Sequence, residues 1–163
     1  MLPAPGVYAE LTTVLLITVS ACTTPLNLDN PALTVTMPAE ISMVLAFTFS
    51  RTDHGPETLA MRVDAGGRSL GYSADTGPGW SMEALGAGLD LALCEATMPI
   101  EEEHTLDHLS ARQAGSSARA AGAGRLVLTH LWSSLDPGEA QFRGSEAFGA
   151  PVEVASVGAR YDV

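Results

Sequence analysis

The stretch LDLALCEAT at residues 89–97 decides the fold. Residues 89–94 are apolar except for Asp90, and a run of this length is typical of a strand in a sheet that is covered on both faces. Glu95 follows directly, so its carboxylate is expected at the end of that strand. We therefore predict a buried strand that delivers an acidic group to one edge of a sheet.

Downstream of this strand, helices and strands alternate. The predicted elements are a helix over residues 110–121, a strand over 125–129, a helix over 136–149 and a strand over 152–155. Ser110 and Gln113 have the spacing of a capping box, in which the two side chains satisfy the first free backbone groups of a helix. Asp136 and Pro137 supply a cap and a first-turn proline for the second helix. Strands that alternate with helices predict an α/β layered domain.

Upstream of residue 89, turn residues separate three β-like runs. The predicted strands cover residues 43–50, 58–63 and 69–74, with turns at 65–67 and 75–79, and a short helix is predicted over 81–86. Residues 1–40 show no recognisable chemistry and are left unassigned. The predicted domain therefore covers residues 41–163.

The composition favours one folded domain with an acidic surface. Of the 163 residues, 46% are hydrophobic and 17% are charged, which provides enough apolar material for a core. Lys and Arg number 8 against 19 Asp and Glu, a formal net charge of -11, so the sequence contains no basic groove for a nucleic-acid backbone. The two cysteines, Cys22 and Cys94, form neither a disulfide framework nor a paired ligand spacing. Cys94 is expected to be an ordinary buried thiol.

The apolar segment 11–21 ends just before Cys22, as a lipoprotein signal does. It is too short to span a bilayer as a helix. The residues before it include Glu10 but no Lys or Arg, whereas a signal peptide begins with positive charge. A buried strand, or a non-native start of the chain, is therefore the favoured interpretation, and we expect a cytoplasmic protein without a membrane partner. A lipoprotein anchored at Cys22 is the weaker alternative.

Three of the four histidines share their predicted location with two acidic residues. Each of these residues lies at the end of a predicted strand or just before a helix cap: His54, Asp75, Glu95, His108 and His130. Because sites in α/β sheets gather beyond the carboxyl ends of strands, we expect these side chains to converge. Imidazole nitrogen and carboxylate oxygen are normal zinc ligands. The fourth histidine, His104, lies in an acidic loop and is expected to be solvated.

Five segments resemble, in order and spacing, motifs of metallo-β-lactamase-fold hydrolases of the ribonuclease Z-like, cyclic-nucleotide phosphodiesterase-like kind. The segments are TDH at 52–54, SADT at 73–76, LCEAT at 93–97, HLS at 108–110 and LTHL at 128–131. The last four are similar to that family's S-G-D-T, L-x-E-A-T/S, H-S/T and T-H motifs, with Ala74 in place of the glycine. The family's H-x-H-x-D-H motif appears nowhere in the sequence. The chain therefore resembles the C-terminal part of such an enzyme, from residue 41 to the end.

This resemblance implies a zinc-dependent hydrolase that cleaves a phosphodiester with a metal-activated water. His54 would bind the first of two zinc ions, Asp75 would bridge both and His130 would bind the second. His108 would donate a proton to the leaving oxygen, and Glu95 would orient it. The implied fold is the C-terminal half of an αββα sandwich, with one mixed sheet and helices on its outer face. Because the other half is missing, we expect one face of the sheet to be unusually exposed and apolar.

The acidic charge favours a small anionic phosphodiester, such as a cyclic nucleotide, over an RNA 3′ end as the substrate. The missing motif supports a second hypothesis, in which the chain is a truncated or degenerate product. In that case the half-domain would be a non-catalytic binding or dimerisation module. A homodimer is compatible with both hypotheses.

Overall fold

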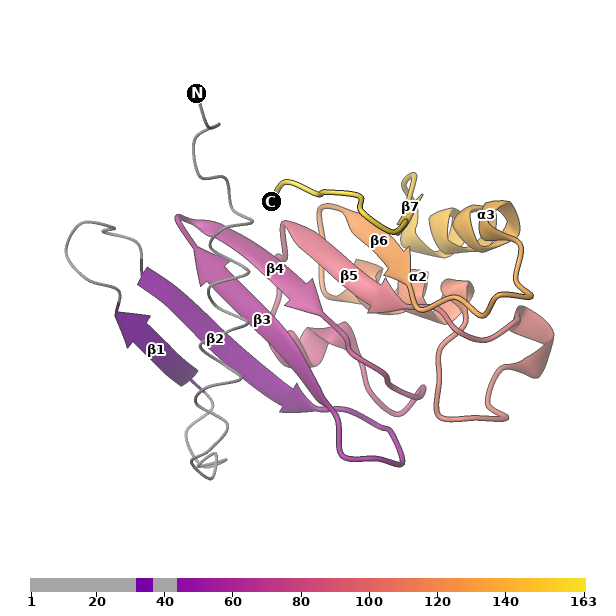
Figure 1. Cartoon of the computed structure of the whole chain (residues 1–163), viewed down its shortest axis with the longest axis horizontal. Helices are drawn as coiled ribbons and strands as arrows, with labels where there is room; N and C mark the ends of the chain where they lie inside the picture. Colours follow the sequence, from indigo (N-terminus) through magenta and orange to yellow (C-terminus); the bar gives the residue numbers. More distant parts are fainter. Residues whose placement is uncertain (1–31, 37–43) are drawn as a thin grey trace.

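The computed structural model describes residues 32–36 and 44–163, which form one seven-stranded mixed sheet with its strands in sequence order (Figure 1). Strands β1 to β4 pair antiparallel, whereas β4 to β7 pair in parallel. The predicted α/β fold with one mixed sheet is therefore confirmed. The strand proposed for residues 11–21 and the alternative anchor at Cys22 lie outside the described residues.

The antiparallel half pairs strands that are neighbours in the sequence. They are β1 (Ala32–Thr36), β2 (Val44–Arg51), β3 (Leu59–Ala65) and β4 (Arg68–Tyr72). Ala65 pairs with Arg68, so Gly66 and Gly67 alone connect β3 to β4. Both glycines have positive φ, 58° and 80°, as a two-residue hairpin turn requires. The turn predicted at residues 65–67 is confirmed.

The parallel half has helices in its connections. In chain order it contains β5 (Leu91–Glu95), α2 (Ala111–Ala120), β6 (Leu126–Thr129), α3 (Pro137–Phe148) and β7 (Glu153–Val154). Ser110 caps α2 in the predicted capping box, since its hydroxyl accepts from Gln113 N at 3.1 Å and its N–H donates to the Gln113 side chain at 2.9 Å. Asp136 caps α3 by accepting from Glu139 N at 2.9 Å, and Pro137 is the first helical residue. Both predicted helices are confirmed.

Two 3-10 turns occupy the loops on either side of β5. The first, η1 (Met82–Leu85), lies where the sequence predicts a helix over residues 81–86. It stays a single turn because Gly86, with a φ of 87°, ends it. The second, η2 (Ile100–Glu102), is not predicted from the sequence. None of the helices in the described ranges is long and apolar enough to cross a membrane.

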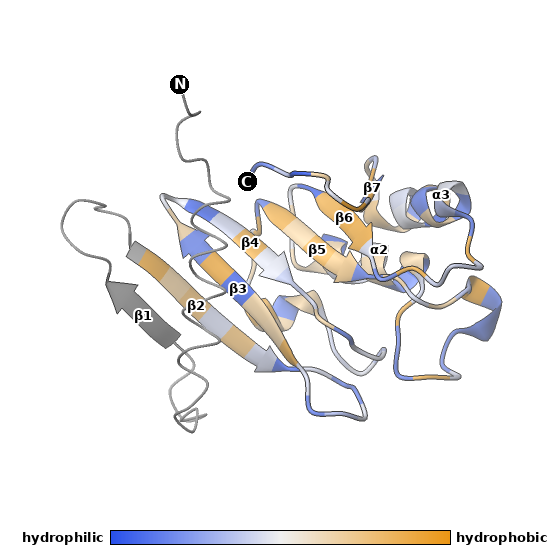
Figure 2. Ribbon diagram, in the orientation of Figure 1, coloured by the Kyte–Doolittle hydropathy of each residue, from blue (hydrophilic) through white to orange (hydrophobic). Residues whose placement is uncertain are grey.

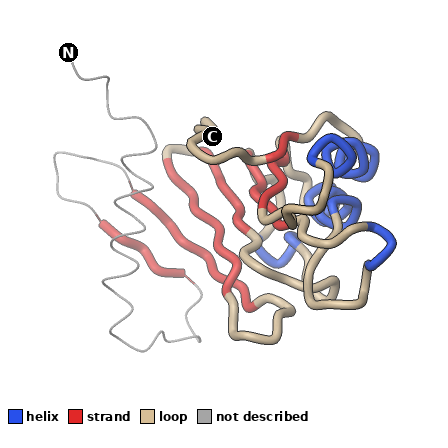
Figure 3. The backbone as a smooth tube through the Cα atoms, turned by 45° about the vertical axis from the view of Figure 1, so that its right-hand side comes forward, coloured by secondary structure: helices blue, strands red, loops and turns tan. Residues whose placement is uncertain are grey.

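The helices and η1 cover one face of the sheet, and the larger core lies between the two layers (Figure 3). Four strand residues on this face, Ala92, Cys94, Leu126 and Leu128, are fully buried. Burial raises the pKa of Cys94 to about 12, so this thiol is protonated and unreactive, as predicted for an ordinary buried cysteine. Figure 2 shows how apolar residues concentrate along β5 and β6, the strands at the centre of this core.

The opposite face of the sheet is less exposed than the sequence predicts. Its apolar residues at alternating strand positions include Leu45, Phe47, Val63, Leu91 and Val127. These residues are at most 5% exposed, so the expectation of an unusually exposed face is wrong at its centre. Arg125, also on this face, contacts the C-terminal segment. The Arg125 guanidinium donates to the Asp162 carbonyl at 3.2 Å and lies 5.9 Å from the centre of the Tyr161 ring.

Helices α2 and α3 pack backbone against backbone at one point. A Cβ atom placed on Gly115 would lie 2.5 Å from the Gly144 carbonyl oxygen and 3.0 Å from the Ala147 Cβ. Both glycines are buried. The lack of a side chain at these positions allows the close approach, so this contact sets the spacing of the helical layer.

Gly115→Ala is expected to destabilise the fold, although alanine is the better helix former by about 1 kcal/mol. The added methyl group must displace the Gly144 carbonyl, and overpacking of this kind costs about 1–3 kcal/mol. The measurement is the urea midpoint of the full chain, which should fall. Ser116→Ala, on the exposed side of α2, is the matched control and should leave the midpoint unchanged or raise it. A Gly115→Ala midpoint at or above that of the parent would contradict the close packing.

Candidate active site

The carboxylate of Glu95 lies at the centre of the site. Glu95 is the last residue of β5 and is 1% exposed. Its Oε1 accepts hydrogen bonds from Thr76 N at 2.7 Å and from His108 Nδ1 at 2.8 Å. Its Oε2 accepts from Leu109 N at 3.2 Å and from Thr97 N at 3.3 Å. Burying a carboxylate is costly unless its lone pairs are satisfied, and these four donors satisfy them.

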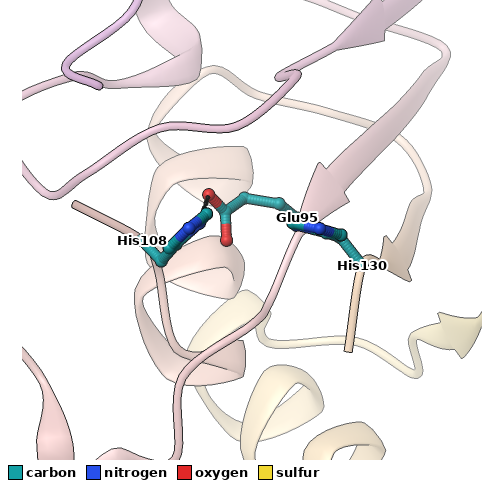
Figure 4. A group of neighbouring side chains, drawn as sticks. All are labelled: Glu95, His108 and His130. Carbon is teal, nitrogen blue, oxygen red and sulfur yellow. Dashed lines mark hydrogen bonds and ion pairs between the residues drawn. The ribbon is translucent and has the colours of Figure 1, made fainter. Parts of the chain in front are cut away.

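The contact with Glu95 fixes the ring of His108 (Figure 4). His108 lies two residues before the cap of α2, and its side chain is 18% exposed. Because an ionised carboxylate can only accept, Nδ1 carries a proton and Nε2 is left for a substrate, a proton or a metal. The predicted proximity of Glu95 and His108 is thus present. Their catalytic roles stay predictions.

His130 and Asp75 form a second imidazole–carboxylate pair, which is more exposed. His130 Nδ1 lies 3.3 Å from Asp75 Oδ1, and the two side chains are 48% and 38% exposed. The Thr97 hydroxyl donates to the His130 carbonyl oxygen at 2.8 Å, so at its 2.9 Å contact with His130 Nδ1 it acts as the acceptor. This arrangement favours a proton on Nδ1 of His130 and a lone pair on Nε2.

His54 completes a row of three imidazoles. It lies in the loop between β2 and β3, where its Nδ1 contacts the Pro56 carbonyl oxygen at 3.3 Å and Thr58 Oγ1 at 3.2 Å. Its ring centre lies 5.1 Å from that of His108, which in turn lies 5.5 Å from that of His130. The structure therefore brings together all five residues that the sequence places at the site.

The loop that carries Asp75 is held by side-chain hydroxyls. Ala74 has a φ of 52°, in the left-handed region, and β4 ends at Tyr72, two residues before the predicted end of that strand. Ser73 Oγ donates to the Ala74 carbonyl at 2.7 Å, and Thr52 Oγ1 donates to the Asp75 carbonyl at 2.8 Å. These contacts fix the backbone on both sides of the Asp75 side chain.

Three threonines support the site although the sequence predicts no role for them. They are Thr52, Thr76 and Thr97. The sequence signal for two of them is their neighbourhood, since Thr76 follows Asp75 and Thr97 lies two residues after Glu95 in the LCEAT motif. That signal indicates proximity but not which backbone or ring atom each threonine contacts.

The charge at the site comes from its carboxylates. Burial, followed by the negative charges of Asp75 and Glu95, raises the pKa of Tyr72, so this phenol stays protonated at neutral pH. The nearby Cys94 thiol is protonated as well. Neither residue therefore supplies an anionic nucleophile. Carboxylates beside imidazoles form an environment that favours a cation.

Within the described part of the chain, one group of side chains offers three metal-ligand atoms within 4.8 Å of one another. It consists of Glu95, His108 and His130. Two of these residues are ones to which the sequence analysis assigns catalytic roles. The short separation follows in part from the hydrogen bond between Glu95 and His108, and both Glu95 oxygens already accept hydrogen bonds.

Ala74→Gly is expected to raise the stability of the chain by roughly 0.5 kcal/mol, because glycine avoids the left-handed strain while losing more chain entropy on folding. Ala120→Gly, at an exposed position in α2, is the matched control. It should lower stability by about 1 kcal/mol. Urea unfolding of both variants checks the opposite signs. An equal loss in both would contradict the conformation of Ala74.

Comparison with known proteins agrees with this geometry. The model of a family described as a beta-lactamase superfamily domain matches residues 4–131. Ribonuclease Z of Mycobacterium bovis is 33% identical over 119 residues, which cover 64% of this chain and 42% of that protein. An uncharacterised protein of Mycobacterium tuberculosis is 38% identical over 99 residues, which cover 56% of this chain and 36% of that protein.

A solved structure shares the fold. The metallo-β-lactamase fold protein YhfI from Bacillus subtilis superposes with a TM-score of 0.67 at 25% identity, over 80% of this chain and 51% of that protein. The chain thus spans less than half the length of the two curated relatives described above. With the family match, the mixed sheet and the histidine–carboxylate cluster at its edge, the chain belongs to the beta-lactamase superfamily domain family and carries part of a metallo-β-lactamase fold.

Proposed function

We propose that this chain supplies part of the active site of a zinc-dependent hydrolase that cleaves phosphodiesters with a metal-activated water. The observation that carries the proposal is the Glu95–His108 pair. The Glu95 carboxylate, which is 1% exposed, fixes the imidazole of His108. The rings of His54 and His130 lie next to that imidazole. The similarity to ribonuclease Z supports the reaction class.

The donor set fits zinc. Nδ1 of His54 and Nδ1 of His130 each contact oxygen acceptors, which leaves the Nε2 lone pair as the ligand atom. Asp75 is 38% exposed and can offer a carboxylate oxygen. We assign His54, Asp75 and His130 to the metal, and Glu95 to orientation because its oxygens are already engaged. When bound, zinc would lower the pKa of a water and polarise the phosphoryl oxygens.

His108 is the proposed general acid. Glu95 accepts the Nδ1 hydrogen of His108, so Nε2 is the atom that exchanges a proton with the leaving oxygen. The fixed ring is the contribution of this chain to that step, because a general acid must be held within hydrogen-bond reach of its substrate. The contact with Glu95 and the position just before α2 keep this ring in one orientation, which supports the proposed role.

A small phosphodiester is the proposed substrate. All eight basic residues are arginines, against a formal net charge of -11. Several of them already pair with acids: Arg62 with Asp64, Arg112 with Glu103, Arg125 with Glu153 and Arg143 with Glu139. The positive charge that holds an anionic substrate would therefore come from the metal, which suits a cyclic nucleotide better than a long RNA. The cytoplasmic location and a homodimer stay predictions.

A non-catalytic binding or dimerisation module is the second candidate. The 163 residues lack the H-x-H-x-D-H motif, which favours this alternative. The zinc content of the purified protein distinguishes the two hypotheses, because a non-catalytic module is not expected to contain zinc. The comparison is between this chain and a longer version that carries the H-x-H-x-D-H motif, both purified without chelator.

His108→Ala should lower phosphodiester turnover by roughly 100- to 10,000-fold, because general acid catalysis contributes that much. Zinc content should stay unchanged, since this residue donates a proton and is not a ligand. Turnover is measured with a cyclic nucleotide and bis(p-nitrophenyl) phosphate on a longer version of the chain that carries the H-x-H-x-D-H motif. His104→Ala, in the exposed loop before it, is the control and should leave both quantities unchanged. Full turnover in His108→Ala would remove the role, and loss of zinc would make His108 a ligand.

His130→Ala should lower the zinc content of the purified protein, because it removes one of the proposed ligand nitrogens. Elemental analysis after dialysis against trace zinc measures this content, and the His104→Ala variant again serves as the reference. If His130→Ala retains as much zinc as the parent, the assignment of this residue to the metal is wrong.

A further inference from the structure

Thr97 links the two imidazole–carboxylate pairs of the site. It is fully buried, and its backbone N–H donates to Glu95 Oε2 at 3.3 Å. Its hydroxyl contacts both the carbonyl oxygen and Nδ1 of His130, at 2.8 Å and 2.9 Å. The Glu95–His108 pair and the His130–Asp75 pair therefore share this one residue.

The hydroxyl of Thr97 connects the chain segments that follow β5 and β6, just beyond the end of the sheet. The pairing of β5 with β6 ends at Glu95 and Thr129, and Ala96 N–H still donates to the Thr129 carbonyl at 2.9 Å. One residue further along, the Thr97 N–H donates to the Glu95 carboxylate, and the Thr97 hydroxyl donates to the His130 carbonyl. The side chain of Thr97 therefore continues the connection between the two segments beyond the Ala96–Thr129 hydrogen bond.

The same hydroxyl determines the protonation pattern of the His130 ring. A hydroxyl has one hydrogen, which Thr97 gives to the His130 carbonyl oxygen. Its remaining lone pairs can only accept, so the ring nitrogen beside it must be a donor. The carbonyl contact also supports the backbone of His130, whose φ of 57° lies in a region that non-glycine residues occupy only when the surroundings hold them there.

We propose that Thr97 is a positioning residue that fixes the ring orientation and the Nδ1–H tautomer of His130, so that Nε2 binds the metal. The inference rests on the proposed function, because it takes His130 as a zinc ligand. Asp75 also lies near His130 Nδ1, but at 3.3 Å and with a side chain that is 38% exposed. Thr97 is the shorter contact and lies out of reach of water, so it dominates the orientation.

Three variants separate positioning from packing. Thr97→Val removes the hydroxyl and keeps the shape of the side chain, whereas Thr97→Ser keeps the hydroxyl and removes the methyl group. Thr76→Val is the matched control, because Thr76 is also fully buried and its N–H also donates to Glu95, at 2.7 Å. The Thr76 hydroxyl contacts Gly77 and Asp53 but no histidine.

Two measurements test the proposal. Nitrogen NMR of the imidazoles in the metal-free chain, at a pH where the rings are neutral, should show the Nδ1–H tautomer for His130. Thr97→Val should shift that tautomer toward Nε2–H and weaken zinc binding by roughly 10- to 100-fold, as loss of a contact behind a metal-ligating histidine does. Thr97→Ser should resemble the parent in both measurements, and Thr76→Val should leave the tautomer of His130 unchanged.

Two results would overturn the proposal: an Nε2–H tautomer of His130 in the parent, or equal effects of Thr97→Val and Thr76→Val on that tautomer. If Thr97→Val does not fold, the tautomer in the parent and in Thr97→Ser decides. Absence of zinc binding, both in the parent chain and in a longer version that carries the H-x-H-x-D-H motif, would refute the proposed function. The NMR spectra would still show whether Thr97 positions His130, so the two failures are distinguishable.

Discussion

The site depends on the buried carboxylate of Glu95. Removing a carboxylate from water costs several kcal/mol even after the protein relaxes, so the charge is tolerated only while its donors stay in place. Those donors come from three segments: the loop after β4, the residues after β5 and the loop before α2. Because each segment stabilises the same charge, the three are ordered together, and His108 is fixed as a consequence.

Strained backbone at the edge of the site also indicates that this region is functional. Ala74 and His130 both adopt positive φ, at a cost of about 1–2 kcal/mol for each residue. A hydroxyl meets the carbonyl of each, from Ser73 and from Thr97. Strain of this kind persists where the surroundings over-determine the conformation, and it clusters at functional sites. The strain is therefore an argument for function that does not rest on the resemblance of motifs.

The sequence predicts contacts that depend on local chemistry and misses those that depend on loop placement. The caps at Ser110 and Asp136 are local, so both helices begin where expected. Glu95 and His108 meet because a strand end and a helix start place them at one edge. The Thr97 hydroxyl, by contrast, reaches a residue 33 positions away, and Thr52 reaches one 23 positions away. The expectation of an exposed sheet face was wrong for a similar reason, since the burial of Leu45, Phe47 and Val63 depends on packing between residues that lie apart in the sequence.

Burial separates the two imidazole–carboxylate pairs and suits them to different tasks. Glu95 is 1% exposed, and both of its oxygens accept hydrogen bonds, so it cannot turn toward a cation without leaving buried donors unpaired. Asp75 is 38% exposed and meets His130 in a single 3.3 Å contact, so its carboxylate can approach a cation at little cost. The buried pair can therefore hold a proton in place, whereas the exposed pair can offer lone pairs. This difference in burial is why we place the proton donor at His108 and the metal at His130 and Asp75.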